Sequence, residues 1–174
     1  ASKTAEAGKA KGGIAEQSDV ATKYHTATHL LQQALVNTLG DQVSQKGSNI
    51  NSERMRFDFT FERPMTAEEI QKVQDIVNEK IKEDLPVTME VMTLDQAKAE
   101  GARALFVNKY GEQVKVYTIG RDAKKDWFSK EVCGGPHVQH TAQIGDFKIV
   151  KEQSSSAGVR RIKAVISGGL PLDK

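Results

Sequence analysis

Two small clusters of histidine and cysteine, far apart in the sequence, restrict most strongly how this chain can fold. They are His25-Thr26-Ala27-Thr28-His29 and Cys133-Gly134-Gly135-Pro136-His137, which together use the one cysteine and three of the four histidines. Helical residues four apart lie on one face, about 5–6 Å apart at Cβ, so His25 and His29 can bind one ion together. We therefore expect the fold to bring the segment at Cys133 against a helix that carries the histidine pair.

Three imidazoles and one thiolate form a donor set that suits Zn²⁺, which prefers four nitrogen or sulfur ligands in a tetrahedron. Either cluster alone has a plain structural explanation, because helical histidines often lie on a half-buried face and a lone cysteine often packs as a small core residue. Together they predict a zinc site at His25, His29, Cys133 and His137. His140 is the spare imidazole, able to replace His137 or to act beside the site.

Composition narrows the classes of function. A chain of 174 residues suits one domain and is long enough to bury a core. Its 25 Lys and Arg against 23 Asp and Glu give a net charge of only +2, so any contact with nucleic acid must use local basic patches. One cysteine excludes an internal disulfide and fits a reducing compartment. No stretch approaches the roughly 18 apolar residues of a membrane span, so a cytoplasmic protein without membrane contact is expected.

Apolar residues at helical spacing predict two substantial helices and one short one. The first begins near Ser18 or Asp19 and ends at Gly40. The second follows a capping box at Thr66 and closes before Pro86, and a second capping box at Thr93 begins a short helix that stops at Gly101. The apolar stripes are Val20, Tyr24, Ala27, Leu31, Ala34 and Leu35 in the first helix, and Ile70, Val73, Val77 and Ile81 in the second.

Alternating apolar and polar residues predict strands, most clearly where Met55, Phe57, Phe59 and Phe61 point one way and Arg54, Arg56, Asp58 and Thr60 the other. Further strands are expected at 87–91, 114–119, 146–150 and 159–166, with a turn at 109–111. The pattern predicts an α+β fold, with helices packed on one face of a mainly antiparallel sheet. We expect a flexible arm at 1–17, one domain at 18–167 and a tail at 168–174.

Six motifs, in order along the chain, closely resemble the editing domain of alanyl-tRNA synthetase, also called its second additional domain. They are His25-Thr26-Ala27-Thr28-His29-Leu30-Leu31, Gln45-Lys46-Gly47-Ser48, Arg56-Phe57-Asp58-Phe59, Cys133-Gly134-Gly135-x-His137-Val138, Ile144-Gly145-x-Phe147-Lys148-Ile149 and Ala157-Gly158-Val159-Arg160-Arg161-Ile162. The domain is shared with threonyl-tRNA synthetases and with free-standing editing proteins. Pro136 stands where alanyl enzymes usually have Thr and is closer to the threonyl version.

The resemblance implies hydrolysis of serine or glycine from mischarged tRNA(Ala). A site shaped for alanine rejects such small competitors weakly, so a second, hydrolytic site is needed. The resemblance places Thr28 and Gln45 in the editing pocket, with Cys133 acting through the ion. The structural alternatives to a pocket role are that Thr28 hydrogen-bonds the backbone of its own helix and that Gln45 is a solvated surface residue. Zn²⁺ would either activate a water or, closed by four ligands, organise the pocket and anchor the substrate.

The remaining expectations concern partners. Lys46, Arg56, Arg160 and Arg161 are the candidate contacts to the tRNA acceptor end, and Arg160 and Arg161 alternate on a strand, so at most one faces the pocket. The chain shows no ATP site, so it resembles either a domain of a larger synthetase, which would bind ATP elsewhere, or a short free-standing editor. A threonyl-type editor and a non-catalytic module that binds tRNA, with zinc serving only its folding, are the competing hypotheses.

Overall fold

The computed structural model describes residues 2–104 and 113–173, with side chains from residue 18 onward. Three helices are formed: α1 (Ser2–Leu39), α2 (Ala67–Lys82) and α3 (Leu94–Ala99). The strands are β1 (Gln45–Ile50), β2 (Met55–Thr60), β3 (Val87–Thr93), β4 (Gln113–Asp122), β5 (Asp126–Val132), β6 (Asp146–Ser156) and β7 (Val159–Ser167). A 3-10 turn, η1 (Thr141–Gln143), precedes β6.

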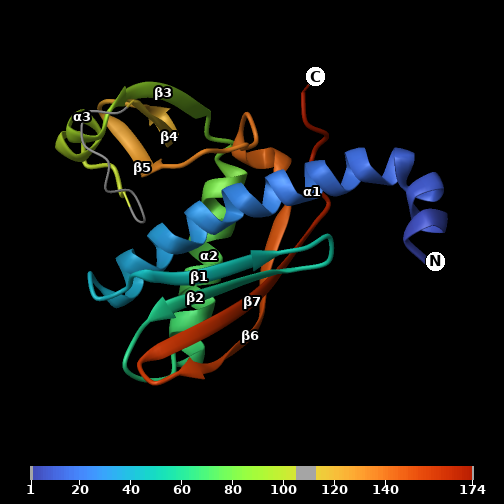
Figure 1. The fold of residues 1–174 in the computed structure, drawn as a ribbon. Helices are drawn as coiled ribbons and strands as arrows, with labels where there is room; N and C mark the ends of the chain where they lie inside the picture. Colours follow the sequence, from blue (N-terminus) through green and yellow to red (C-terminus); the bar gives the residue numbers. More distant parts are fainter. Residues whose placement is uncertain (1, 105–112, 174) are drawn as a thin grey trace.

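The strands form two antiparallel sheets, which confirms the α+β class but replaces the single expected sheet with two. One sheet has the order β1-β2-β7-β6 and the other the order β3-β4-β5. Helix α1 crosses the molecule between them and contacts strands of both, while α2 packs against α1 and β6 (Figure 1). The two sheets therefore meet across α1, the helix that carries the first histidine cluster.

The larger core lies between the two long helices and the inner face of the four-stranded sheet. Strand β2 alternates as predicted: Met55, Phe57 and Phe59 are fully buried against the helices. The predicted stripes of both helices join them, with Val73, Val77 and Ile81 from α2. Helix α1 is covered on several sides, so Leu30 and Gln32 are buried although neither belongs to the predicted stripe.

Local backbone chemistry explains the helix ends that the sequence predicted. Thr66 and Thr93 each accept a hydrogen bond from the backbone of the third helical residue, and that residue's side chain bonds back to the cap. Both capping boxes are therefore confirmed. The start of α1 was predicted wrongly, because it begins at Ser2 and not at Ser18 or Asp19. The domain boundaries at residues 17/18 and 167/168 stay predictions.

Two strands were not predicted from the sequence, and in a third the apolar residues that should be buried are exposed. Neither strand β1 nor strand β5 was predicted. Strand β3 was predicted from apolar alternation, yet Met89 and Val91 are 47% and 52% exposed, because they do not point toward either core. The turn predicted at 109–111 lies outside the described residues. Within the described part of the chain, no helix is both long and apolar enough to cross a membrane.

Candidate metal centre and its pocket

The structure brings the four predicted ligands together from two distant segments. Residues His25 and His29 lie one turn apart on α1, and Cys133 and His137 come from the segment between β5 and η1. Their candidate donor atoms all lie within 4.8 Å of one another. The Cys133 Sγ is 3.3 Å from the His25 Nε2, and the His137 ring centroid lies 4.2 Å from that of His25. The spare imidazole, His140, bonds Asp84 instead.

The hydrogen-bond network assigns a protonated Nδ1 to two of the rings. The His25 Nδ1 lies 2.9 Å from the Pro136 carbonyl oxygen, which can only accept, so this nitrogen carries the proton. The Thr26 hydroxyl donates to the Thr22 carbonyl at 3.3 Å, so it accepts from the His137 Nδ1 at 2.9 Å. In both rings the Nε2 is left with its lone pair, the form that a metal needs.

The third ring has a carboxylate behind it. The His29 Nδ1 lies 3.2 Å from the Glu131 Oε2, an ion-pair distance without the alignment of a full hydrogen bond. Both side chains are buried, at 7% and 12% exposure. A carboxylate behind a ligating histidine is a common way to fix the ring and raise its basicity. The sequence analysis missed Glu131, although a strand at β5 would have placed it on the same face as Cys133, two residues later.

The environment of His137 favours its neutral form. Burial lowers the pKa of this ring, and the adjacent His29 and His25 lower it further. Its Nε2 is buried and has no hydrogen-bond partner among the residues described. An unpartnered buried nitrogen beside a sulfur and two further imidazoles is costly unless something binds it. The cluster is therefore able to hold a metal ion, and its donors fit a site of three nitrogens and one sulfur.

A cavity of about 170 Å³ adjoins the cluster and contains both predicted pocket residues. The Thr28 hydroxyl donates to the Tyr24 carbonyl at 2.9 Å, the plain helical bond, and keeps its capacity to accept. The Gln45 Nε2 lies 3.4 Å from the Ser48 Oγ. The sequence analysis did not assign Ser48, Ile50 or Val132 to the pocket. The lining consists of His25, Thr28, His29, Gln45, Ser48, Ile50, Glu131, Val132 and Cys133.

The four basic residues predicted to contact tRNA lie outside this lining. Lys46 is exposed on β1, directly after Gln45. Arg160 and Arg161 point to opposite faces of the sheet, as expected for strand neighbours. Arg160 binds the Glu152 carboxylate through Nε and Nη2 at 2.8 Å each, and Arg161 binds Asp58 through the same two nitrogens at 2.9 and 3.1 Å. Neither arginine reaches the pocket, and their role in tRNA binding stays a prediction.

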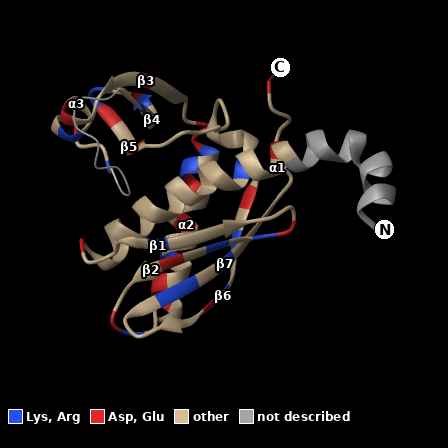
Figure 2. Cartoon of the chain, viewed as in Figure 1, with Lys and Arg blue, Asp and Glu red and all other residues tan. Residues whose placement is uncertain are grey.

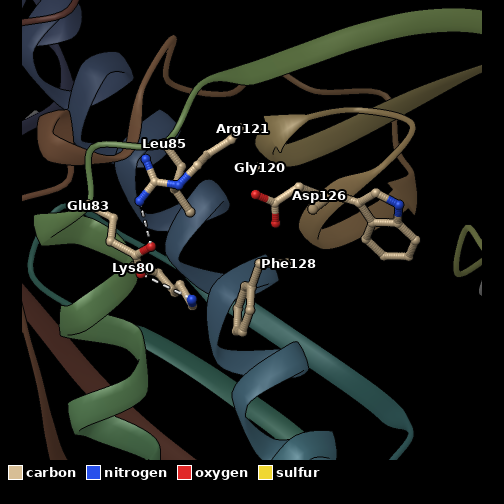
Figure 3. A pocket seen from close by; sticks show the side chains of 8 residues that line it. Lys80, Glu83, Leu85, Gly120, Arg121, Asp126 and Phe128 are labelled. Carbon is tan, nitrogen blue, oxygen red and sulfur yellow. Dashed lines mark hydrogen bonds and ion pairs between the residues drawn. The ribbon is translucent and has the colours of Figure 1, made fainter.

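A second hollow, of about 100 Å³, lies between the end of α2 and the β4–β5 hairpin (Figure 3). Three of its charged groups bind one another, because the Glu83 carboxylate lies 3.0 Å from the Lys80 ammonium and 2.9 Å from the Arg121 guanidinium. Lys80 also lies over the Phe128 ring at 5.1 Å. The metal-competent cluster belongs to the other cavity, so we assign this hollow to the contact between α2 and the hairpin.

Comparison with known proteins relates this sequence to a family. Residues 114–163 match the model of the threonyl and alanyl tRNA synthetase second additional domain. The chain is also 60% and 58% identical, over 90% of its length, to alanine–tRNA ligases of Treponema denticola and Treponema pallidum. It is 48% identical over 95% of its length to that of Shouchella clausii.

The chain therefore belongs to the second additional domains of threonyl and alanyl tRNA synthetases. More specifically, it corresponds to the alanyl version, the editing domain of an alanyl-tRNA synthetase. It spans 25% of the length of the two Treponema enzymes and 18% of the Shouchella one.

Proposed function

We propose that this chain is an aminoacyl-tRNA deacylase that releases serine or glycine from mischarged tRNA(Ala). The observation that carries the proposal is the convergence of His25, His29, Cys133 and His137 beside a small cavity, which the first three of these residues help to line. The identity to alanine–tRNA ligases favours tRNA(Ala) over tRNA(Thr), despite Pro136. The chemistry is ester hydrolysis: a water oxygen bonds the acyl carbon, the ester bond to the ribose breaks, and the ribose oxygen takes up a proton.

The cavity supports selection of serine, the hydroxylated one of the two proposed substrates, over alanine. Its volume of about 170 Å³ limits the side chain that can enter. The Thr28 hydroxyl and the Gln45 and Ser48 side chains offer hydrogen-bond partners for the hydroxyl of serine. Alanine would leave such partners unsatisfied, which costs about 1–3 kcal/mol for a buried group. This difference would protect correctly charged tRNA from hydrolysis.

We further propose that the resident ion is Zn²⁺, held by the three imidazoles and the Cys133 thiolate. When bound, zinc would supply a fixed positive charge that anchors the substrate and stabilises developing negative charge beside it. Other groups of the chain contact these four candidate ligands and hold them in place. The Gly135 N–H donates to the Cys133 Sγ at 3.4 Å, while Pro136, Glu131 and Thr26 each contact the Nδ1 of one imidazole.

The direct test is the release of labelled serine from Ser-tRNA(Ala), with Ala-tRNA(Ala) as the unreactive substrate and Ser-tRNA(Thr) as the competing one. We expect Cys133→Ala and His137→Ala each to lower the rate by about 100-fold or more, because one ligand of the ion is lost. The matched control is His140→Ala, which removes a nearby imidazole that bonds Asp84 outside the cluster and should keep the rate.

Two outcomes would contradict the proposal. Full activity of a normally folded Cys133→Ala variant would exclude the cluster from the reaction. Binding of Ser-tRNA(Ala) by the wild-type chain without serine release, at full zinc occupancy, would support a non-catalytic tRNA-binding module instead.

A further inference from the structure

A row of three cations crosses the four-stranded sheet on the face away from the helices. The strand register pairs Arg56 on β2 with Lys163 on β7, and Lys163 in turn with Lys151 on β6. Paired residues in antiparallel strands lie on the same face, about 5 Å apart. Asn49 on β1 continues the row to the edge of the sheet. Three like charges therefore stand directly opposite one another, which destabilises the sheet.

One nearby carboxylate neutralises this row only in part. The one acidic side chain at the next paired position is Asp58, which Arg161 binds through two nitrogens. The Asp58 Oδ1 is 3.9 Å from the Arg56 Nε, and that nitrogen has no hydrogen-bond partner. Among the residues that the structure describes, Lys151 and Lys163 form no ion pair. The repulsion between these three side chains is thus retained in the folded chain.

The row lies on an open surface. The helices cover the opposite face, where Phe57 and Ile162, one position before Asp58 and Lys163, are fully buried. On the row's own face Lys151 and Asn49 are exposed, and Arg56 and Lys163 are half-buried. Figure 2 shows basic segments on neighbouring strands of this sheet.

The row also has a short connection to the pocket. Strand β1 is the edge of the sheet, and its residues alternate between the two faces. Gln45, Ser48 and Ile50 line the cavity, whereas Asn49 belongs to the row. A flexible, extended ligand that crosses the sheet edge at β1 can contact the basic face and the cavity at the same time.

We infer that the row Arg56, Lys163 and Lys151 is a docking surface for the phosphate backbone of RNA. The inference rests on the proposed function, which makes a tRNA the partner of this chain. Charge complementarity carries it: a phosphodiester chain would relieve a repulsion that Asp58 relieves only at Arg56, and that no ion pair in the described structure relieves at Lys163 and Lys151. Such contacts set affinity and position, with little sequence selectivity.

The test separates RNA binding from stability, because the two should change in opposite directions. Lys163→Glu would place a carboxylate between Arg56 and Lys151, and Lys163→Gln would remove the central charge. We expect Lys163→Glu to weaken the Kd for uncharged tRNA by about tenfold at moderate salt and Lys163→Gln by about threefold, with the slope of log Kd against log salt reduced by about one. Both variants should raise the thermal unfolding midpoint of the RNA-free chain, Lys163→Glu the more.

The matched control is Lys72→Glu, which makes the same charge change at an exposed position of α2, away from the row. It should keep the wild-type salt slope. Equal weakening by Lys72→Glu would mean that net charge alone governs binding, and would overturn the inference. An unchanged Kd in both Lys163 variants would do the same, as would a lowered unfolding midpoint in both, because the row would then not be repulsive.

The binding measurement uses uncharged tRNA and does not depend on hydrolysis. A wild-type chain that binds tRNA through the row but releases no serine would refute the proposed deacylase and keep the docking surface. Serine release that Lys163→Glu leaves unchanged in KM, with an unchanged Kd, would refute the docking surface and keep the deacylase.

Discussion

The two pairs of candidate ligands are held in different ways. His25 and His29 project from a helix whose position is fixed by a large buried core, with Ala27, Leu30 and Leu31 fully buried around them. Cys133 and His137 come from a segment without regular secondary structure between β5 and η1. The helix pair is therefore positioned by its own backbone, whereas the second pair depends on specific contacts.

Most of those contacts are made to α1 itself. The Pro136 carbonyl accepts from His25, and the Thr26 hydroxyl accepts from both the His137 Nδ1 and the Val138 N–H. The third anchor is Gly135, which packs directly against Tyr117 of β4. The helix thus acts as the template on which the second half of the site is assembled, so changes in the 133–138 segment should affect metal binding more than global stability.

The largest effect is expected where that segment has no room for a side chain. Gly135 has a φ of +70°, and a Cβ on it would lie 2.3 Å from the Tyr117 Oη and 2.8 Å from the Cζ of the same ring. We expect Gly135→Ala to displace the segment, with about a 100-fold loss of zinc affinity and a cost of about 1–3 kcal/mol in the free energy of unfolding. Chelator competition and urea unfolding measure the two effects.

The neighbouring glycine provides the control. A Cβ on Gly134 meets nothing within 4 Å, so Gly134→Ala should keep its zinc. Loss of zinc affinity in both variants, or in neither, would contradict the view that contact with Tyr117 positions this segment.

A smaller effect is expected from the one hydroxyl that joins the two pairs. Thr26 is fully buried, and Thr26→Val would leave the His137 Nδ1 and the Val138 N–H without an acceptor. We expect about a tenfold loss of zinc affinity, because the ring loses the group that orients it, and about 1–3 kcal/mol of destabilisation. Thr26→Ser keeps the hydroxyl and should restore zinc affinity to near the wild-type value. Equal affinity in Thr26→Val and Thr26→Ser would show that packing alone holds His137.

The comparison also shows which parts of the fold are readable from sequence. Capping boxes at Thr66 and Thr93 and the alternation in β2 were predictable because they are local patterns with a fixed period or spacing. Strand β5 was missed because its apolar residues are few and its buried positions include Ser129, Lys130 and Glu131. The true start of α1 was missed because Ser18 and Asp19 suit a cap as well as a helix interior.

The candidate site, like the fold, has parts that the sequence predicted and parts that it did not. The four ligand candidates could be chosen from sequence because histidine and cysteine are rare here and their spacing carries meaning. The groups behind them could not, since Thr26, Glu131 and the Pro136 carbonyl acquire their roles only when α1, β5 and the 133–138 segment meet. Arg56 was predicted as a tRNA contact, but the row that it forms with Lys163 and Lys151 was not, because the row exists only across strands, through the register of β2, β7 and β6.

The smallest expected effect concerns pH and the buried ring of the second pair. Burial and the adjacent His29 and His25 lower the pKa of His137 in the folded chain, below the value of about 6.5 that an unfolded histidine has. Below pH 6.5 the His137 ring therefore binds a proton in the unfolded chain but not in the folded chain. The free energy of unfolding of the metal-free chain should fall between pH 7.5 and 5.5, by at most about 1.4 kcal/mol per pH unit for one such proton. Urea unfolding in the presence of a chelator measures this slope.

The Glu69 carboxylate does not titrate in that window, because Arg63 and the Thr66 backbone lower its pKa to about 2. The assignment to the second pair is tested by His137→Gln, which keeps a polar side chain but cannot titrate and should flatten the slope. If His137→Gln has the wild-type slope, the buried ring of His137 does not carry the pH dependence, and the contrast between the two pairs would not extend to protonation.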